Sequence, residues 1–156
     1  MKPELDIWKP GAHSGTFRGN NLAFVTATQA LETYWANTAF TAEIQRKERQ
    51  VRDWLENLVH SYPNAGLSVR GRGLIQGLVC NTTPALANRI AQNAFKKGVV
   101  IETSGAHDEV LKLLPALTIE EELLSKGLDV IEASVAEALA EEGQSARILK
   151  FGGKRQ

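Results

Sequence analysis

Apolar and polar positions recur with helical periodicity through the first half of the chain. Residues 22–35 predict one helix, and residues 41–60 predict a second that ends before Tyr62-Pro63-Asn64-Ala65-Gly66. One face of the second helix is apolar and contains Ile44, Val51, Trp54, Leu55, Leu58 and Val59. Its opposite face is charged and is expected to meet solvent; it contains Glu43, Arg46, Lys47, Glu48, Arg49, Arg52 and Asp53.

The second half of the chain alternates strand and helix patterns. Residues 67–81 predict one strand, which Gly71, Gly73 and Gly77 are expected to bend. The next helix is expected to begin at a cap provided by Thr82 or Thr83, with Pro84 in its first turn. The buried stripe of this helix is predicted to contain Leu86, Ile90, Ala94 and Phe95.

Two more strands and a last helix complete the pattern. Strands are expected at 99–102 and at 110–119, where Pro115 indicates a strand end or a sheet edge. The helix after Glu120 has a stripe of Leu124, Leu128, Ile131, Val135 and Leu139. The order β-α-β-β-α predicts an α+β sandwich of two layers, and the tail from 144 onward is expected to be frayed.

Composition narrows the classes of function. The 156 residues are 43% hydrophobic, enough for one modest core, and 18 basic residues balance 18 acidic ones, which gives no support for a nucleic-acid partner. One cysteine, Cys80, excludes an internal disulfide and fits a reducing compartment. No apolar run has the roughly 20 residues of a membrane span, and no signal peptide is visible, so we expect a cytoplasmic protein without a membrane partner.

Candidate chemistry begins at the segment from Gly15 to Asn21. Gly15 and Gly19 permit a backbone with positive φ, Thr16 offers a hydroxyl, and Asn20 or Asn21 is a good helix cap. A glycine-containing turn before a helix can be simply a capped turn, or it can bind an anion with its free N–H groups and the helix dipole. His13, His60 and His107 are too scattered along the chain to predict a metal site.

The longer segment from Trp8 to Ala23 carries a resemblance. It contains Gly11-x-His13-x-x-Thr16-Phe17-x-Gly19-Asn20-x-Leu22-Ala23, and it resembles the segment that follows the cofactor lysine in class III, pyridoxal-phosphate-dependent aminotransferases. The resemblance extends from Lys2 to about Ala140. It implies the C-terminal small domain of a fold type I aminotransferase, preceded by a long helical link, with the large cofactor-binding domain absent.

The resemblance also implies boundaries within the chain. Residues 1–21 correspond to the end of a large-domain segment with its phosphate-contact loop, and 22–62 to linking helices. Residues 63–143 correspond to the small α+β domain and 144–156 to a flexible tail. The lysine that forms the Schiff base in this family lies upstream of the matched region, so no catalytic residue is assigned here and the isolated chain is expected to be inactive. Lys2 and Lys9 flank prolines in a polar loop and are read as surface residues.

The resemblance implies two binding contacts, one to the cofactor and one to the substrate. Thr16 matches a threonine that donates to the cofactor phosphate across a dimer interface, and Phe17 and Arg18 beside it are further candidates. Lys112 stands where related enzymes have an arginine that grips the substrate carboxylate, ahead of a Pro-x-Leu like Pro115-Ala116-Leu117. A lysine can attract a carboxylate, but only as a point charge without the bidentate fork of arginine.

The implied reaction converts L-aspartate 4-semialdehyde and L-glutamate into L-2,4-diaminobutyrate and 2-oxoglutarate, with pyridoxal 5′-phosphate as cofactor and at least a homodimer as the assembly. Two alternatives stay open at this stage. One is a non-catalytic α+β interaction module, or the remnant of a split or truncated transaminase gene, with Phe24, Tyr34, Trp35 and Phe40 as a partner surface. The other is a class III enzyme of the ornithine or 4-aminobutyrate type.

Overall fold

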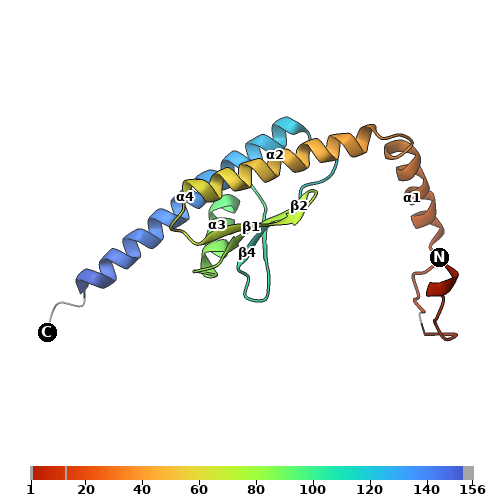
Figure 1. The fold of residues 1–156 in the computed structure, drawn as a ribbon, viewed down its shortest axis with the longest axis horizontal. Helices are drawn as coiled ribbons and strands as arrows, with labels where there is room; N and C mark the ends of the chain where they lie inside the picture. The colour runs from red at the N-terminus through yellow and green to blue at the C-terminus, as the bar shows by residue number, and fades with distance from the viewer. Residues whose placement is uncertain (1, 13, 153–156) are drawn as a thin grey trace. The chain divides into compact units, whose positions relative to one another are not determined.

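A computed structural model describes the backbone of residues 2–12 and 14–152 and the side chains of 2–12 and 14–143. The chain divides into two units, residues 1–41 and residues 42–156 (Figure 1). No helix in the described ranges is both long and apolar enough to cross a membrane.

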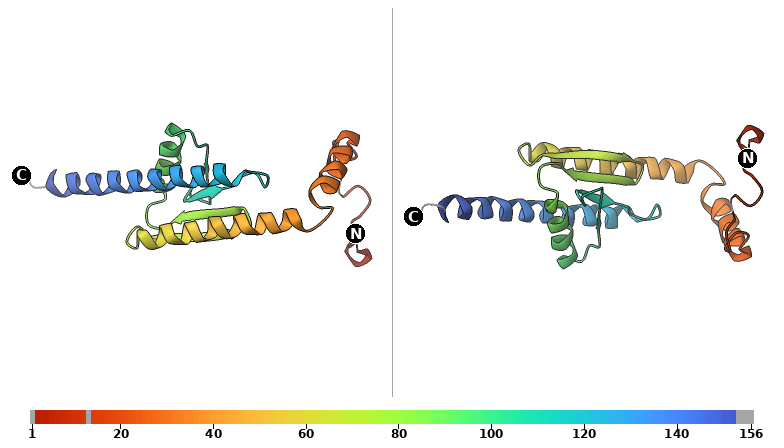
Figure 2. Two further views of the ribbon diagram at one scale, coloured as in Figure 1. Left: turned by 90° about the horizontal axis from the view of Figure 1, so that it is seen from above. Right: turned by 90° about the horizontal axis from the view of Figure 1, so that it is seen from below.

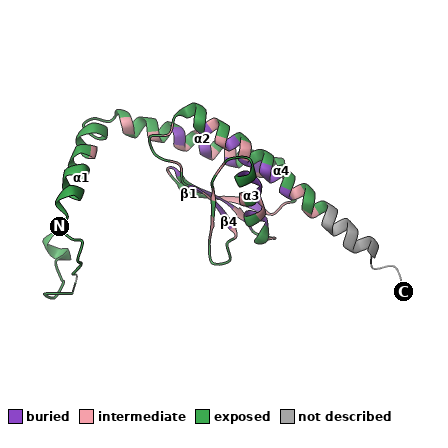
Figure 3. Ribbon diagram, turned by 180° about the vertical axis from the view of Figure 1, so that it is seen from behind, coloured by how far each residue is buried: buried purple, intermediate pink, exposed green. Residues whose placement is uncertain are grey.

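The first unit contains the 3-10 turn η1 (Pro3–Leu5) and helix α1 (Asn21–Tyr34). The helix agrees with the prediction to within one residue, and Asn20 is confirmed as its cap, because its side chain accepts from the Ala23 N–H at 3.1 Å. None of the described residues of this unit is buried, and α1 is exposed almost throughout in Figure 3. The unit therefore has no core of its own.

Helix α2 (Ala39–Ser61) confirms the second predicted helix, and Val51, Leu55 and Leu58 are buried on its apolar face. One assignment on this helix is wrong. Lys47 was expected on the solvent face, but the residue is only 1% exposed. It lies where α2 meets the segment before the last helix, so burial of its aliphatic stem and a bond to a distant carbonyl override the local charge pattern.

The single bent strand expected at 67–81 is also wrong, because the structure contains a hairpin of β1 (Leu67–Arg72) and β2 (Ile75–Cys80). The strands are antiparallel, Arg72 pairs with Ile75, and Gly73-Leu74 forms the turn. Gly71 has φ +120°, and Gly73 has φ +59°. The positive φ of Gly73 falls in the turn, so the chain reverses where only a bend was predicted.

The remaining elements are α3 (Ala85–Lys96), β3 (Glu102–Ser104), β4 (Val110–Leu113) and α4 (Glu121–Gly152). The four strands form one sheet in the order β1-β2-β4-β3, and all its pairings are antiparallel. The fold class is thus the expected α+β sandwich, with the observed order β-β-α-β-β-α. Strand β3 begins where the expected 99–102 strand should end, and β4 stops before Pro115.

Three details of the helices differ from expectation. No side chain caps α3, because Pro84 occupies the cap position and Thr83 contributes only its carbonyl, to the Leu86 N–H. Phe95 is 69% exposed, since the buried face of α3 turns toward Asn93 and Ala94 instead. Helix α4 continues through 144–152, which were expected to be frayed, and 153–156 lie outside the described residues.

Helices α2 and α4 run side by side and in the same direction across the sheet (Figure 2). Three cross-links join them in order: Arg46 to Glu121, Gln50 to Ser125 and Trp54 to Glu132. The core lies between the helices and the sheet. Its fully buried members include Leu55, Leu78, Ile90, Leu111 and Val135.

Candidate functional site

The Thr16 segment forms an exposed turn directly before α1. The Arg18 N–H donates to the Gly15 carbonyl at 3.1 Å, and Gly19 has φ +75°, which only glycine adopts readily. Gly15 also permits positive φ, but it does not adopt it. Thr16, Phe17 and Arg18 are all exposed. His13 lies outside the described residues.

This turn can bind an anion. A hydroxyl and the N-terminus of a helix of 14 residues lie within a few residues of each other, and helix N-termini attract negative charge. Asn20 uses its side-chain oxygen on the Ala23 N–H, so one end group of the helix is already satisfied. The turn therefore offers the Thr16 hydroxyl and the remaining N–H groups of the helix start to an anion such as a phosphate.

Lys112 lies on β4 opposite Glu102 of β3. Its Nζ is 3.1 Å from the Glu102 Oε2, and the side chains are 30% and 74% exposed. The register places Arg70, Gly77, Lys112 and Glu102 in one row across the sheet. Because successive side chains alternate between faces, this row points away from the face that contains Leu78 and Leu111. Lys112 is thus accessible but already paired.

A cleft of about 420 Å³ opens beside Lys112. Lys112 and Glu102 provide its charged lining, and α4 provides part of its apolar lining. The remaining lining comes from Val99, Val100, Ile101, Leu113, Leu114, Pro115 and Ile119. The cleft is mostly apolar, and Lys112 and Glu102 are the charged residues among those that line it, a composition typical of small-ligand sites.

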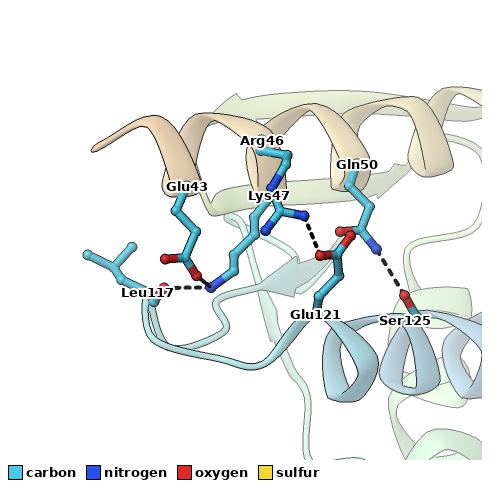
Figure 4. A network of polar contacts seen from close by, with 7 residues as sticks. All are labelled: Glu43, Arg46, Lys47, Gln50, Leu117, Glu121 and Ser125. Carbon is cyan, nitrogen blue, oxygen red and sulfur yellow. Dashed lines mark hydrogen bonds and ion pairs between the residues drawn. The ribbon is translucent and has the colours of Figure 1, made fainter. Parts of the chain in front are cut away.

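A network of polar contacts joins α2 to the connection that follows β4 and to the start of α4 (Figure 4). The Lys47 ammonium contacts the Glu43 carboxylate at 2.6 Å and donates to the Leu117 carbonyl at 3.2 Å. The bond and charge of Lys47 hold the pKa of Glu43 below its ordinary value. Arg46 pairs with Glu121, which raises the pKa of the arginine. The Gln50 amide donates to the Ser125 hydroxyl at 3.0 Å.

Sequence reasoning missed this network because it assigned Lys47 and Arg46 to a solvated face. The signal available in the sequence was the spacing of Glu43 and Lys47, four residues apart on one helix. That spacing predicts a surface ion pair and does not reveal the bond to Leu117, which is 70 residues away in the chain.

The other singled-out residues lie apart from these sites. Cys80 is confirmed as a core residue, and burial raises the pKa of its thiol to about 11. His60 and His107 are both exposed. Within the described residues, no group of three or more His, Cys, Asp or Glu side chains is arranged to hold a metal ion.

Comparison with known proteins gives consistent matches. The model of the family described as aminotransferase class-III matches residues 3–135. The diaminobutyrate–2-oxoglutarate transaminase of Bordetella parapertussis is 80% identical over 156 residues, which are 100% of this chain and 36% of that protein. The transaminase of the same name from Vibrio cholerae is 52% identical over 137 residues, which are 88% of this chain and 33% of that protein.

Solved structures agree with these matches. Acetylornithine aminotransferase from Elizabethkingia anophelis is 28% identical with a TM-score of 0.67, and the match covers 85% of this chain and 34% of that one. N-acetylornithine aminotransferase from Stenotrophomonas maltophilia is 29% identical with a TM-score of 0.68, over 79% of this chain and 33% of that one. The chain thus spans about a third of the length of these relatives.

Proposed function

Because the chain belongs to the class III aminotransferase family, we propose that it forms the C-terminal part of a diaminobutyrate–2-oxoglutarate transaminase. The reaction converts L-aspartate 4-semialdehyde and L-glutamate into L-2,4-diaminobutyrate and 2-oxoglutarate, the first step of ectoine biosynthesis. The observation that carries this proposal is 80% identity, over the whole chain, to a protein of that name. A cytoplasmic location is part of the proposal, supported by the presence of only one cysteine, the buried Cys80, which leaves no internal disulfide among these residues.

The cofactor in this proposal is pyridoxal 5′-phosphate, which when bound supplies an electron sink for the amino acid. The Thr16 hydroxyl donates to a phosphate oxygen at the start of α1, and Phe17 and Arg18 border the same turn. The exposure of all three residues supports this role, since a phosphate could reach them without displacing core residues.

The proposed substrate contact is Lys112. Its ammonium attracts a substrate carboxylate, although Glu102 competes for the same charge at 3.1 Å. A single point charge fixes a carboxylate less firmly than an arginine fork does, so the apolar wall of the cleft would contribute to the fit.

The proposed assembly is at least a homodimer of complete enzyme chains. Helix α1 supports this, because its apolar side chains are exposed, with Leu22 at 78%, Phe24 at 61% and Val25 at 66%. An apolar surface of this kind is typical of a face that other polypeptide covers. The 156 residues alone are expected to lack transaminase activity, because none of them is assigned as the lysine that forms the Schiff base in this family.

A second candidate function is a non-catalytic interaction module. The cluster of Tyr34, Trp35 and Phe40, whose ring centroids lie 4.9 to 6.1 Å apart, favours a partner surface near the end of α1. A partner surface must be accessible, and Tyr34 and Trp35 of this cluster are 40% and 45% exposed. A module of this kind would bind a partner without needing Thr16 or Lys112.

Complementation tests the main proposal. The chain is co-expressed with the preceding part of the Bordetella parapertussis relative, which the match leaves uncovered, and transamination is measured with both substrates. We expect activity only when both polypeptides are present. The variant Thr16→Val should weaken pyridoxal phosphate binding by roughly tenfold or more, since a hydrogen bond to a charged group contributes on the order of 1.5–3 kcal/mol.

The matched control is Thr26→Val on the same unit. The Thr26 hydroxyl bonds the helix backbone at Leu22, so its loss should leave cofactor affinity unchanged. Activity of the 156-residue chain alone would contradict the proposal, and so would normal cofactor affinity in Thr16→Val.

A further inference from the structure

Lys47 is an unusual residue for its environment. It is 1% exposed, and a lysine is almost never fully buried unless its charge is paired. Removing an ammonium from water is costly, and an apolar side chain of similar length would fill the same space without that penalty. The contacts of the Lys47 ammonium must therefore explain why a lysine is buried at this position.

The ammonium makes two contacts of different kinds. Glu43, its ion-pair partner, lies one turn earlier on the same helix and is 44% exposed, so this pair fixes nothing beyond α2. The second contact is the bond to the Leu117 carbonyl, which crosses from α2 to the connection between β4 and α4. The Leu117 bond is thus the contact that acts on another part of the fold.

The connection that Leu117 belongs to, residues 114–120, has little regular structure. It contains one turn, in which the Ile119 N–H donates to the Ala116 carbonyl at 3.0 Å. Pro115 has no N–H to donate. Ile119 packs against the core, whereas Leu114 is 58% exposed and Leu117 is 39% exposed, so apolar packing holds the end of this connection and not the part around Leu117.

The same connection forms a wall of the cleft. Leu114, Pro115 and Ile119 line it, and Lys112 lies only two residues before Leu114 on β4. A shift of this wall would change both the width of the cleft and the end of the strand that presents Lys112. We propose that Lys47 is a positioning residue that holds the 114–120 connection in place and thereby shapes the cleft for a carboxylate at Lys112. The carboxylate part of this inference rests on the proposed function.

The test uses the full 156-residue chain, labelled with ¹³C and ¹⁵N, and L-glutamate as the probe. Binding is followed by the ε-methylene signal of Lys112, local order by amide hydrogen exchange in 114–120, and global stability by urea unfolding. The variant is Lys47→Met, which keeps the length of the side chain and removes the donor. Lys126→Met is the matched control, because Lys126 is 66% exposed and its ammonium pairs with Glu122, one turn earlier on the same helix.

We expect Lys47→Met to bind L-glutamate at least tenfold more weakly and to exchange faster in 114–120 than in α3. The control should change neither quantity. A purely structural lysine would lower protection throughout the second unit and leave the affinity of the folded fraction unchanged, so this pattern would overturn the inference.

Two further outcomes are decisive. If the wild-type chain shows no Lys112 response to L-glutamate, the proposed role of Lys112 fails, and the positioning role is then judged by exchange alone. Equal protection of 114–120 in wild type and Lys47→Met would overturn it. If Lys47→Met does not fold, the smaller Lys47→Gln is measured in its place with the same expected direction. Failure of both variants to fold would assign Lys47 to the core and also overturn the inference.

Discussion

Replacing Gly71 by alanine tests the geometry of the β1–β2 hairpin. Gly71 has φ +120°, a region that residues with a Cβ rarely adopt. A Cβ at this position would lie 2.6 Å from the Cα of Gln76 and would also press against the Ile75 carbonyl. Both are backbone atoms of the paired strand, so neither can move without distorting the hairpin.

The neighbouring Gly73 provides an internal comparison. Its φ of +59° lies in the left-handed region, and an added Cβ would meet nothing within 4 Å. Gly73→Ala should therefore lower the free energy of unfolding by about 1 kcal/mol, which is the cost of holding an alanine in the left-handed conformation. Gly71→Ala combines backbone strain with overpacking, and each should cost about 1–3 kcal/mol. We therefore expect the free energy of unfolding to fall by about 3 kcal/mol or more.

Urea unfolding of both variants, followed by circular dichroism, measures the difference. The midpoint should fall about three times further for Gly71→Ala than for Gly73→Ala, with the slope of the transition unchanged. Equal losses for the two variants, or a larger loss for Gly73→Ala, would refute the hairpin geometry that distinguishes them.

Three more predictions concern the second unit. Because burial raises the pKa of Cys80 from 9.0 to about 11, the unfolded chain loses this proton first, and stability should fall by on the order of 2–3 kcal/mol as pH rises from about 9 to about 11. Urea midpoints across this range should show the slope in wild type and not in Cys80→Ala. Leu55→Ala removes a side chain that is 0% exposed and should cost about 2–5 kcal/mol, whereas Leu123→Ala, at 55% exposed, should cost about 1 kcal/mol or less. A similar loss in both would contradict the burial of α2. Lys97→Met should raise the pKa of Glu137, which Lys97 now lowers, and an NMR titration that finds no change would show that the pair does not persist in solution.

Helix periodicity predicted the long elements well. The helices at 21–34 and 39–61 were located to within two residues, because their patterns repeat over several turns. Asn20 marks the start of the first helix by a local hydrogen bond that residue type alone suggests. Such signals are short in range and are present before any tertiary contact forms.

The hairpin could not be read in the same way. Its turn is Gly73-Leu74, which lacks the Asn-Gly or Asp-Gly pair that normally marks a two-residue turn. With three glycines in one apolar stretch, a bent strand and a reversal produce the same pattern. The reversal lies at Gly73-Leu74, where Gly73 has φ +59°, and a backbone dihedral is not visible in the sequence.

In the candidate site too, local sequence signals were readable and contacts between distant elements were not. The Thr16 turn was located through a motif whose residues are contiguous, and its role stays a prediction. Lys47 was misplaced because hydrophobic patterning treats every charge as solvated, whereas its actual partner is a carbonyl contributed by another element. Phe95 shows the converse error, since an apolar residue next to a buried stripe was assumed to share it.

The three cross-links between α2 and α4 determine when this part of the fold can form. They join residues 75 to 78 positions apart, so the two helices cannot meet until most of the second unit has been synthesised. Loop closure over such distances is slow compared with the formation of either helix alone. During translation, Val51 and Leu55 would stay exposed to solvent until the residues around Glu132 have left the ribosome. In this interval the nascent chain is most prone to aggregate and most needs a chaperone.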